Sequence, residues 1–252
     1  MKTIVVIPDL QVPYHDRRLV ATFQRFVKDF KPDELACVGD ETDWPMISRW
    51  TRGMEGEYKG AIGRHRDASV AVLKGFRDVH AGPFHLSRSN HGDRPLNYLR
   101  KYAPGLMGLS ELTVESLLRL DDMGITYHTK PYRIAPNTLL MHGDEGGMSQ
   151  IAGQTARKLA DRTGTNIVIG HTHRAGLIPV SKAHGGKVSA ATWGLEVGHM
   201  MDFRSAAYLG GGIGNWQQGF AVLYVDGRNV TPVPVLVQPG GSFVVEGAKW
   251  TP

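Results

Sequence analysis

Residues 166–174 read Asn-Ile-Val-Ile-Gly-His-Thr-His-Arg, and this stretch predicts a buried strand that ends in two histidines. The β-branched residues 167–169 form a short apolar run that suits the interior of a sheet. Gly170 interrupts the run, and His171 and His173 follow it with one residue between them. Two imidazoles at a strand end can bind a metal ion, or they can be ordinary polar residues of a loop. The other strand ends distinguish these interpretations, because a metal site needs further ligands there.

The composition is that of an ordinary globular protein. The chain has 252 residues, of which 41% are hydrophobic and 21% are charged, enough for one large domain or two small ones. It contains no apolar run of membrane-spanning length and no secretory signal, so we expect a cytoplasmic protein without a membrane partner. The single cysteine, Cys37, excludes an internal disulfide. The net charge of +5 favours anionic partners only mildly, and no lysine- or arginine-rich segment indicates a nucleic-acid-binding helix.

Four more apolar runs are each followed by polar residues that can bind metals. The expected strands span residues 3–8, 35–38, 84–86 and 138–141. The polar residues after them are, in the same order, Asp9 and Gln11, Asp40 and Asp43, Asn90 and His91, and His142. Asp16 is placed to cap a helix between the first two strands. This strand–helix–strand order predicts a parallel α/β sheet.

The other segments are expected to form helices and hairpins. Helices are expected near 61–78 and 150–162, and residues 95–123 look helical in pieces, with the amphipathic 111–120 over the site. The expected hairpins pair 132–135 with 138–141, 177–180 with 188–191, and 220–225 with 230–237. Residues 210–214 and 238–252 are expected to be flexible surface segments.

The five strand-end motifs resemble the signature of a known family. They are Asp9-x-Gln11, Gly39-Asp40-x-x-Asp43, Asn90-His91, His142-Gly143 and Gly170-His171-x-His173. Their order and spacing resemble the calcineurin-like metallophosphoesterases, which carry Asp-x-His, Gly-Asp-x-x-Asp, Gly-Asn-His, a lone His and Gly-His-x-His. The resemblance implies a four-layer α/β sandwich of two mixed β-sheets flanked by helices. We expect this domain to span residues 1–238, with a C-terminal tail at 239–252.

The resemblance also implies two divalent metal ions bridged by one carboxylate. The first metal would be held by Asp9, Gln11, Asp40 and His173. The second would be held by Asp40, Asn90, His142 and His171. Mn²⁺ is the expected metal for this oxygen-rich set, and Fe, Zn²⁺ or Ni²⁺ are alternatives. A hydroxide between the two metals would attack phosphorus, and both metals would stabilise the charge of the transition state.

Other residues match positions that act on the substrate in this family. His91 resembles the histidine that protonates the leaving oxygen or binds the phosphate, and Asp43 resembles the carboxylate that orients it. Arg94 has the spacing of a phosphate-binding arginine. Trp44 is an aromatic that can stack on a base if it faces the site, and His15 either lines the site or lies on the surface. The other histidines, His199 among them, are treated as ordinary.

Four departures from the family pattern affect the expected function. Gln11 replaces a histidine, so this amide is either a ligand or a hydrogen-bond partner of one. Ser89 replaces a glycine, with little expected effect. Trp44 replaces an arginine, and Gly92 a glutamate, of the phosphoprotein phosphatases, which argues against that activity.

The expected function is hydrolysis of a phosphodiester, on a nucleotide or cyclic nucleotide. Alternatives are a DNA or RNA nuclease, a phosphomonoesterase or protein phosphatase, and a non-catalytic scaffold on the same fold. Residues 215–220 resemble a stretch of phage-encoded members, which would place the protein in the cytoplasm of a host cell. The sequence does not define the oligomeric state.

Overall fold

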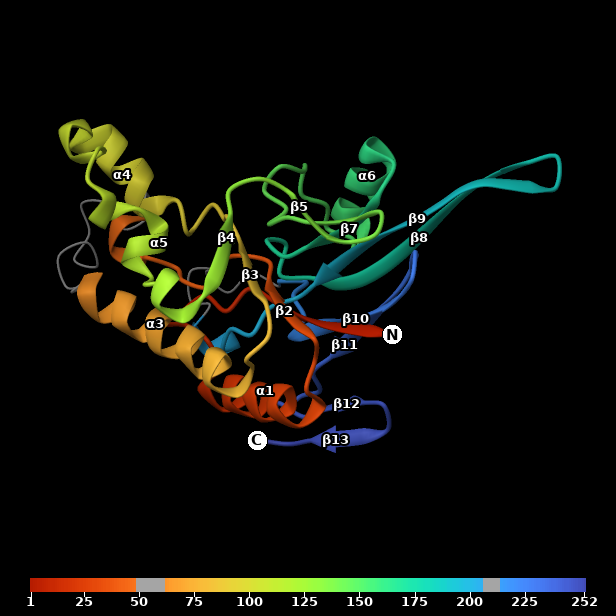
Figure 1. Ribbon diagram of the computed structural model, residues 1–252, viewed down its shortest axis with the longest axis horizontal. Coiled ribbons are helices and arrows are strands. Elements are labelled where there is room, and N and C mark those ends of the chain that lie inside the picture. Colours follow the sequence, from red (N-terminus) through yellow and green to blue (C-terminus); the bar gives the residue numbers. More distant parts are fainter. Residues whose placement is uncertain (49–61, 206–213) are drawn as a thin grey trace.

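The computed structural model describes residues 1–48, 62–205 and 214–252. In these ranges the chain forms two large mixed β-sheets that pack face to face, with helices on both outer sides (Figure 1). The predicted four-layer α/β fold class is therefore confirmed. Residue 61 of one expected helix and residues 210–213 of an expected flexible segment lie outside the described ranges.

The first sheet has the strand order β11-β10-β1-β2-β3-β4. Its strands are β1 (Lys2–Ile7), β2 (Glu34–Cys37), β3 (Phe84–Ser87), β4 (Ile125–His128), β10 (Gly219–Asp226) and β11 (Asn229–Leu236). Strands β1 to β4 are parallel, whereas β10 and β11 run antiparallel to their neighbours. The parallel order of β1 and β2 around a connecting helix is as predicted. Strand β4 is not among the predicted strands, because no apolar run in the sequence indicates it.

The second sheet has the order β5-β6-β7-β9-β8. Its strands are β5 (Tyr132–Ala135), β6 (Thr138–Leu140), β7 (Asn166–Ile169), β8 (Ala175–His184) and β9 (Lys187–Val197). The parallel strands β6, β7 and β9 lie at its centre. The three predicted hairpins are present, but the pairing expected for one of them is wrong. Residues 177–180 pair with 192–195 instead of 188–191, because β8 and β9 are longer than expected and their turn lies further along the chain. Their ends form an arm that extends beyond the body of the molecule (Figure 1), and Val188 there is 66% exposed.

Alternation along the strands separates the core into layers. On β1, Ile4 and Val6 face the second sheet, whereas Val5 and Ile7 pack against helices on the other side. On β7, Val168 joins the layer between the sheets, and Ile167 and Ile169 pack on the outer helix of the second sheet. Each central strand is therefore buried on both faces, which explains its continuous apolar sequence.

The helices cover the two outer faces. They are α1 (Arg17–Phe30), α3 (Ile62–Val79), α4 (Arg94–Tyr102), α5 (Val114–Leu117) and α6 (Gln154–Thr163). Asp16 caps α1 as predicted, because its carboxylate accepts hydrogen bonds from the backbone N–H groups of Arg18 and Leu19. The amphipathic segment 111–120 forms only the short turn Ser110–Leu112 and α5. Among the helices of the described ranges, none combines the length and apolar composition that a membrane crossing needs.

The expectation of a flexible C-terminal surface segment is wrong. Residues 243–245 and 248–250 form the hairpin β12 (Phe243–Val245) and β13 (Ala248–Trp250) below α1 (Figure 1). Phe243 is 1% exposed and packs edge to face on Phe26 and Phe220. A short alternating run among glycines resembles a loop in sequence, and only its fit against the aromatic side chains of α1 and β10 orders it.

Candidate metal centre

The strand ends bring the predicted ligands together at one edge of the two sheets. Four of these residues, Gln11, Asp40, His171 and His173, have backbone φ angles between 49° and 63°. This left-handed conformation is uncommon for residues other than glycine and concentrates at functional sites. The sharp turns there direct the side chains of both sheets toward each other.

Two glycines of the motifs are needed for close packing in this region. A Cβ atom at Gly170 would lie 2.1 Å from Asp9 Oδ1 and 2.5 Å from a methyl group of Val38. A Cβ atom at Gly39 would lie 2.6 Å from that of Ser89, and Gly39 has a φ of 102°. Gly170 therefore lets the second sheet approach the first at the site, and Gly39 lets the segment after β2 approach the segment after β3.

One cluster joins Asp40 with His142 and His171. Asp40 Oδ1 lies 3.3 Å from His142 Nε2, and the side-chain oxygen of Asn90 lies 2.8 Å from that nitrogen and 3.0 Å from His171 Nδ1. The other ring nitrogen of His142 donates a hydrogen bond to the Val38 carbonyl at 3.0 Å. A backbone partner on Nδ1 leaves Nε2 as the ligating nitrogen, which is the usual arrangement of a metal-binding histidine.

A second cluster joins the same Asp40 with Asp9 and His173. Asp9 Oδ2 lies 3.4 Å from His173 Nε2, and both Asp9 oxygens are buried without a hydrogen-bond donor among the described residues. The amide nitrogen of Gln11 donates to Asp40 Oδ2 at 2.7 Å and lies 3.2 Å from His173 Nε2. The Gln11 nitrogen therefore contacts two of the expected ligands, Asp40 and His173.

The charges of this centre fit a bound cation. Burial, with Asp40 nearby, raises the pKa of Asp9 well above its usual value. Burial also opposes ionisation of Asp40, but the facing imidazoles of His142 and His91 outweigh it and hold that pKa well below its usual value. His142 shows the converse, because Asp40 overcomes burial and raises its pKa to about 10. Two buried carboxylates with imidazoles beside them form a donor set suited to divalent metals.

His91 lies beside this centre with the predicted partners. His91 Nδ1 lies 2.6 Å from Asp43 Oδ1 and 3.9 Å from Asp40 Oδ2. Arg94 lies between them, because its guanidinium is 3.0 Å from Asp43 Oδ1 and 2.9 Å from His91 Nε2. Arg94 also donates to the Asp43 carbonyl. The structure therefore brings together His91, Asp43 and Arg94 as one hydrogen-bonded group.

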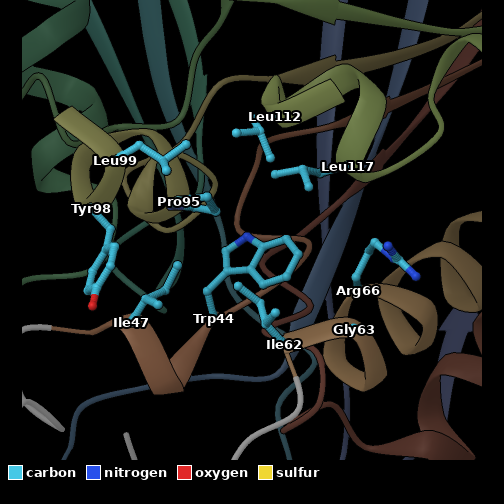
Figure 2. A pocket seen from close by; sticks show the side chains of 10 residues that line it. All are labelled: Trp44, Ile47, Ile62, Gly63, Arg66, Pro95, Tyr98, Leu99, Leu112 and Leu117. Atoms are coloured by element: carbon cyan, nitrogen blue, oxygen red, sulfur yellow. The ribbon is translucent and has the colours of Figure 1, made fainter. Parts of the chain in front are cut away.

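The other two expected substrate contacts lie differently. Trp44 is 1% exposed and borders an apolar pocket formed with α3, α4 and α5 (Figure 2). His15 is half-buried, and its backbone pairs with Met201. Among the described residues, no hydrogen bond or ion pair joins His15 to either Asp/His cluster.

Glu196 is a buried residue that sequence analysis missed. Its carboxylate accepts hydrogen bonds from the backbone N–H groups of Thr155 and Ala156 at the start of α6, at 2.8 and 3.3 Å. It also accepts one from the Thr172 hydroxyl at 2.7 Å. Thr172 separates His171 from His173, so Glu196 anchors the loop that carries both imidazoles. No sequence signal identifies it, since its partners lie 24 to 41 residues away.

His199 lies beside the site, although the sequence indicates only an ordinary histidine there. It is fully buried, pairs through its backbone with Asp9, and its ring centroid is 5.3 Å from that of His173. The backbone N–H of Met201 donates to its Nδ1 at 3.0 Å, which leaves the proton of the neutral ring on Nε2. Burial lowers the pKa of His199 to about 3. His199 follows β9, which runs parallel to β7. Its place beside the site therefore depends on a strand pairing that the sequence does not indicate.

Comparison with known proteins gives relatives over the whole length. No family model matches the chain. It is 39% identical to the Gene 54 protein of Mycobacterium phage D29 and 38% identical to that of Mycobacterium phage L5, covering 99% of this chain and 98% of each relative. Similar solved structures include Vps29 from Chaetomium thermophilum, with 12% identity over 100% of this chain and 99% of that one and a TM-score of 0.49. Another is YfcE, a phosphoesterase from E. coli, with 15% identity over 98% and 97% and a TM-score of 0.39.

Proposed function

The chain belongs to the family of the Gene 54 proteins of Mycobacterium phages D29 and L5, and we propose that it is a calcineurin-like metallophosphoesterase that cleaves phosphodiesters. One observation carries the proposal: two Asp/His clusters share the buried carboxylate of Asp40. A shared carboxylate with imidazoles on both sides is the arrangement needed to hold two divalent ions close together.

The residues at the centre would divide between the two ions. Asp9, Asp40 and His173 would hold one ion, with Gln11 hydrogen-bonded to this set or ligating through its oxygen. Asp40, Asn90, His142 and His171 would hold the other. Bound metal ions supply Lewis-acid chemistry, which lowers the pKa of a water molecule and neutralises charge on the phosphoryl oxygens. Mn²⁺ is the preferred ion of the proposal, because Asp9, Asp40 and Asn90 offer oxygen donors beside the imidazoles.

His91 would act on the leaving oxygen. Asp43 faces its Nδ1, so Nε2 is the ring nitrogen that can hold and give a proton. In the structure the Arg94 guanidinium lies 2.9 Å from that nitrogen. A substrate phosphate that reaches His91 would therefore also meet the Arg94 guanidinium, which can bind a phosphate oxygen. Proton donation by His91 matters most when the leaving alkoxide is a poor leaving group.

A diester suits this set of cations better than a monoester. A monoester dianion needs more positive charge around it, and Trp44 stands where the phosphoprotein phosphatases carry an arginine. A diester carries one negative charge fewer, but its alkoxide depends on an acid such as His91. We further propose that the protein acts in the cytoplasm of a host cell, as its relatives are phage proteins.

The test compares two p-nitrophenyl substrates with the same leaving group. Chelation should abolish hydrolysis, and Mn²⁺ should restore it best. The restored protein should have a higher kcat/KM for thymidine 5′-(p-nitrophenyl phosphate) than for p-nitrophenyl phosphate. An Asp40→Ala variant purified in parallel controls for contaminating phosphatases.

Each alternative has its own outcome in these assays. Full activity in EDTA would exclude the metal mechanism, and a preference for the monoester would make the protein a phosphomonoesterase. Faster cleavage of single-stranded DNA than of nucleotide diesters would identify a nuclease. Bound metal without hydrolysis of any of these substrates would identify a non-catalytic scaffold.

A further inference from the structure

An apolar pocket of about 260 Å³ is lined by residues that follow Asp43 and Arg94 in the chain. Trp44 forms one side of it, and α3, α4 and the segment around α5 form the others (Figure 2). Its walls are side chains such as Ile47, Pro95, Leu99, Leu112 and Leu117. The volume is below the ~300–1,000 Å³ of pockets for drug-sized ligands, and suits a ligand of one or two rings.

A polar group at the pocket lacks a partner. The indole nitrogen of Trp44 is buried, and among the residues that the structure describes no hydrogen-bond acceptor contacts it. Figure 2 shows this nitrogen on the side of the ring that faces Leu112 and Pro95. A buried N–H without an acceptor is costly, at about 1–3 kcal/mol, so a ligand with a matching acceptor would be favoured. The charged residue at the pocket, Arg66, is paired with Asp67 at 2.8 Å.

The chain connects this pocket directly to the group that would meet the phosphate. Trp44 follows Asp43, and Pro95 follows Arg94. Asp43 and Arg94 are the two partners of His91. Neighbouring Cα atoms are about 3.8 Å apart, so these two wall residues place the pocket beside the two partners of His91.

We propose that this pocket binds the nucleobase of the substrate, with a base oxygen or ring nitrogen accepting the Trp44 N–H. The flat apolar faces of a base match the leucine, isoleucine and proline walls, and its edge carries the acceptor. An aliphatic chain would contact the apolar walls but leave the Trp44 N–H unpaired. The link between this pocket and catalysis rests on the proposed phosphodiesterase function, whereas base binding itself does not.

The first experiment measures nucleoside binding to protein from which metal ions have been removed by a chelator, so no catalysis is needed. Adenosine and uridine are titrated by calorimetry or NMR into the full chain and into Leu112→Trp, which fills the pocket. The matched control is Leu109→Trp, because Leu109 lies in the same segment but is 49% exposed and does not line the pocket. Leu112→Trp should abolish binding of both nucleosides, and Leu109→Trp should leave it unchanged. Equal affinities in the two variants, or no binding to the wild-type chain, would overturn the proposal.

A second variant tests the hydrogen bond alone. Trp44→Phe keeps an aromatic ring but removes the N–H, and should weaken nucleoside binding about three- to tenfold. Toluene, which has no acceptor, should bind both proteins alike. Equal losses for toluene and nucleosides would show that the N–H recognises nothing. If Trp44→Phe does not fold, the Leu112 and Leu109 pair still decides.

Assays with metal separate this inference from the function. Nucleoside binding lost in Leu112→Trp, together with no phosphoester hydrolysis in any metal, supports the pocket and contradicts the proposed function. Hydrolysis with the same kcat/KM for thymidine 5′-(p-nitrophenyl phosphate) and methyl p-nitrophenyl phosphate supports the function and overturns the proposal that the pocket binds the base of the substrate.

Discussion

Single residues at the strand ends define the proposed centre, and Asp40 joins its two halves. Its Oδ1 faces His142, and its Oδ2 accepts from Gln11. His91 has a different position, since its closest carboxylate is Asp43 and it belongs to neither Asp/His cluster. A metal-holding and a proton-donating role therefore predict different phenotypes.

Asp40→Ala should remove both metal ions and reduce turnover to background, because one carboxylate serves both clusters. His91→Ala should keep both ions and lower kcat by about 10²–10⁴, the usual contribution of a placed acid. Metal content by mass spectrometry and kcat for substrates of different leaving-group pKa measure these effects. The loss in His91→Ala should shrink for p-nitrophenolate; an equal loss for all leaving groups would assign His91 to phosphate or metal binding instead.

Thr172→Val should weaken metal binding about 10–100-fold, as is typical when a partner of a ligand is lost. The change removes the hydroxyl that donates to Glu196 and also accepts from the Arg174 N–H, so the loop holding His171 and His173 loses its anchor. Competition with a chromophoric chelator measures the affinity. Thr163→Val, which removes an exposed hydroxyl at the end of α6, is the control. Unchanged metal affinity in Thr172→Val would show that Glu196 serves only to cap α6.

At the scale of elements, the C-terminal hairpin is part of the core. Its Phe243 touches residues of α1 and β10, so β12 and β13 cover a face that would otherwise expose Phe26 and Phe220. The neighbouring Val244 is 55% exposed. Because Phe243 points inward and Val244 outward, substitutions at these two positions distinguish the packing of the hairpin from its presence alone.

Phe243→Ala should lower the free energy of unfolding by about 3–5 kcal/mol, because it leaves a cavity among aromatic rings. Val244→Ala, one residue along the same strand, should change it by less than about 0.5 kcal/mol. Urea denaturation followed by circular dichroism measures both. Similar small values for the two variants would mean that the hairpin is detached in solution.

On the scale of the whole molecule, the proposed centre lies between the two sheets. Asp9, Asp40 and Asn90 follow strands of the first sheet, whereas His142, His171 and His173 follow strands of the second. A metal ion bound by both sets would link the sheets at the edge where buried charges otherwise face each other. The apolar layer between the sheets holds the rest of the interface.

Metal binding should therefore stabilise the whole fold, by about 2.7 kcal/mol at a metal concentration 100 times the Kd. The Tm of the wild-type chain should rise on addition of Mn²⁺ and fall on chelation. Asp40→Ala should show no metal-dependent shift. A shift of equal size in this variant would place the stabilising ion elsewhere.

The sequence by itself determined the central strands, the ligand types and their order along the chain. Apolar runs such as 4–7 and 167–169 are buried on both faces, and burial of this kind leaves a local signal that can be read directly. The motif residues Asp40, His142 and His171 could be recognised because metal chemistry restricts which side chains can stand there.

Only the tertiary structure decided which residues support that chemistry. Glu196 and His199 reach the site through the pairing of β9 with β7, and Phe243 is ordered by rings from α1 and β10. These roles depend on contacts between residues distant in sequence, whose side chains carry no local pattern. Gln11 illustrates the difference: its place in the motif is a property of the sequence, but the donation of its nitrogen to Asp40 results from how the two strand ends meet.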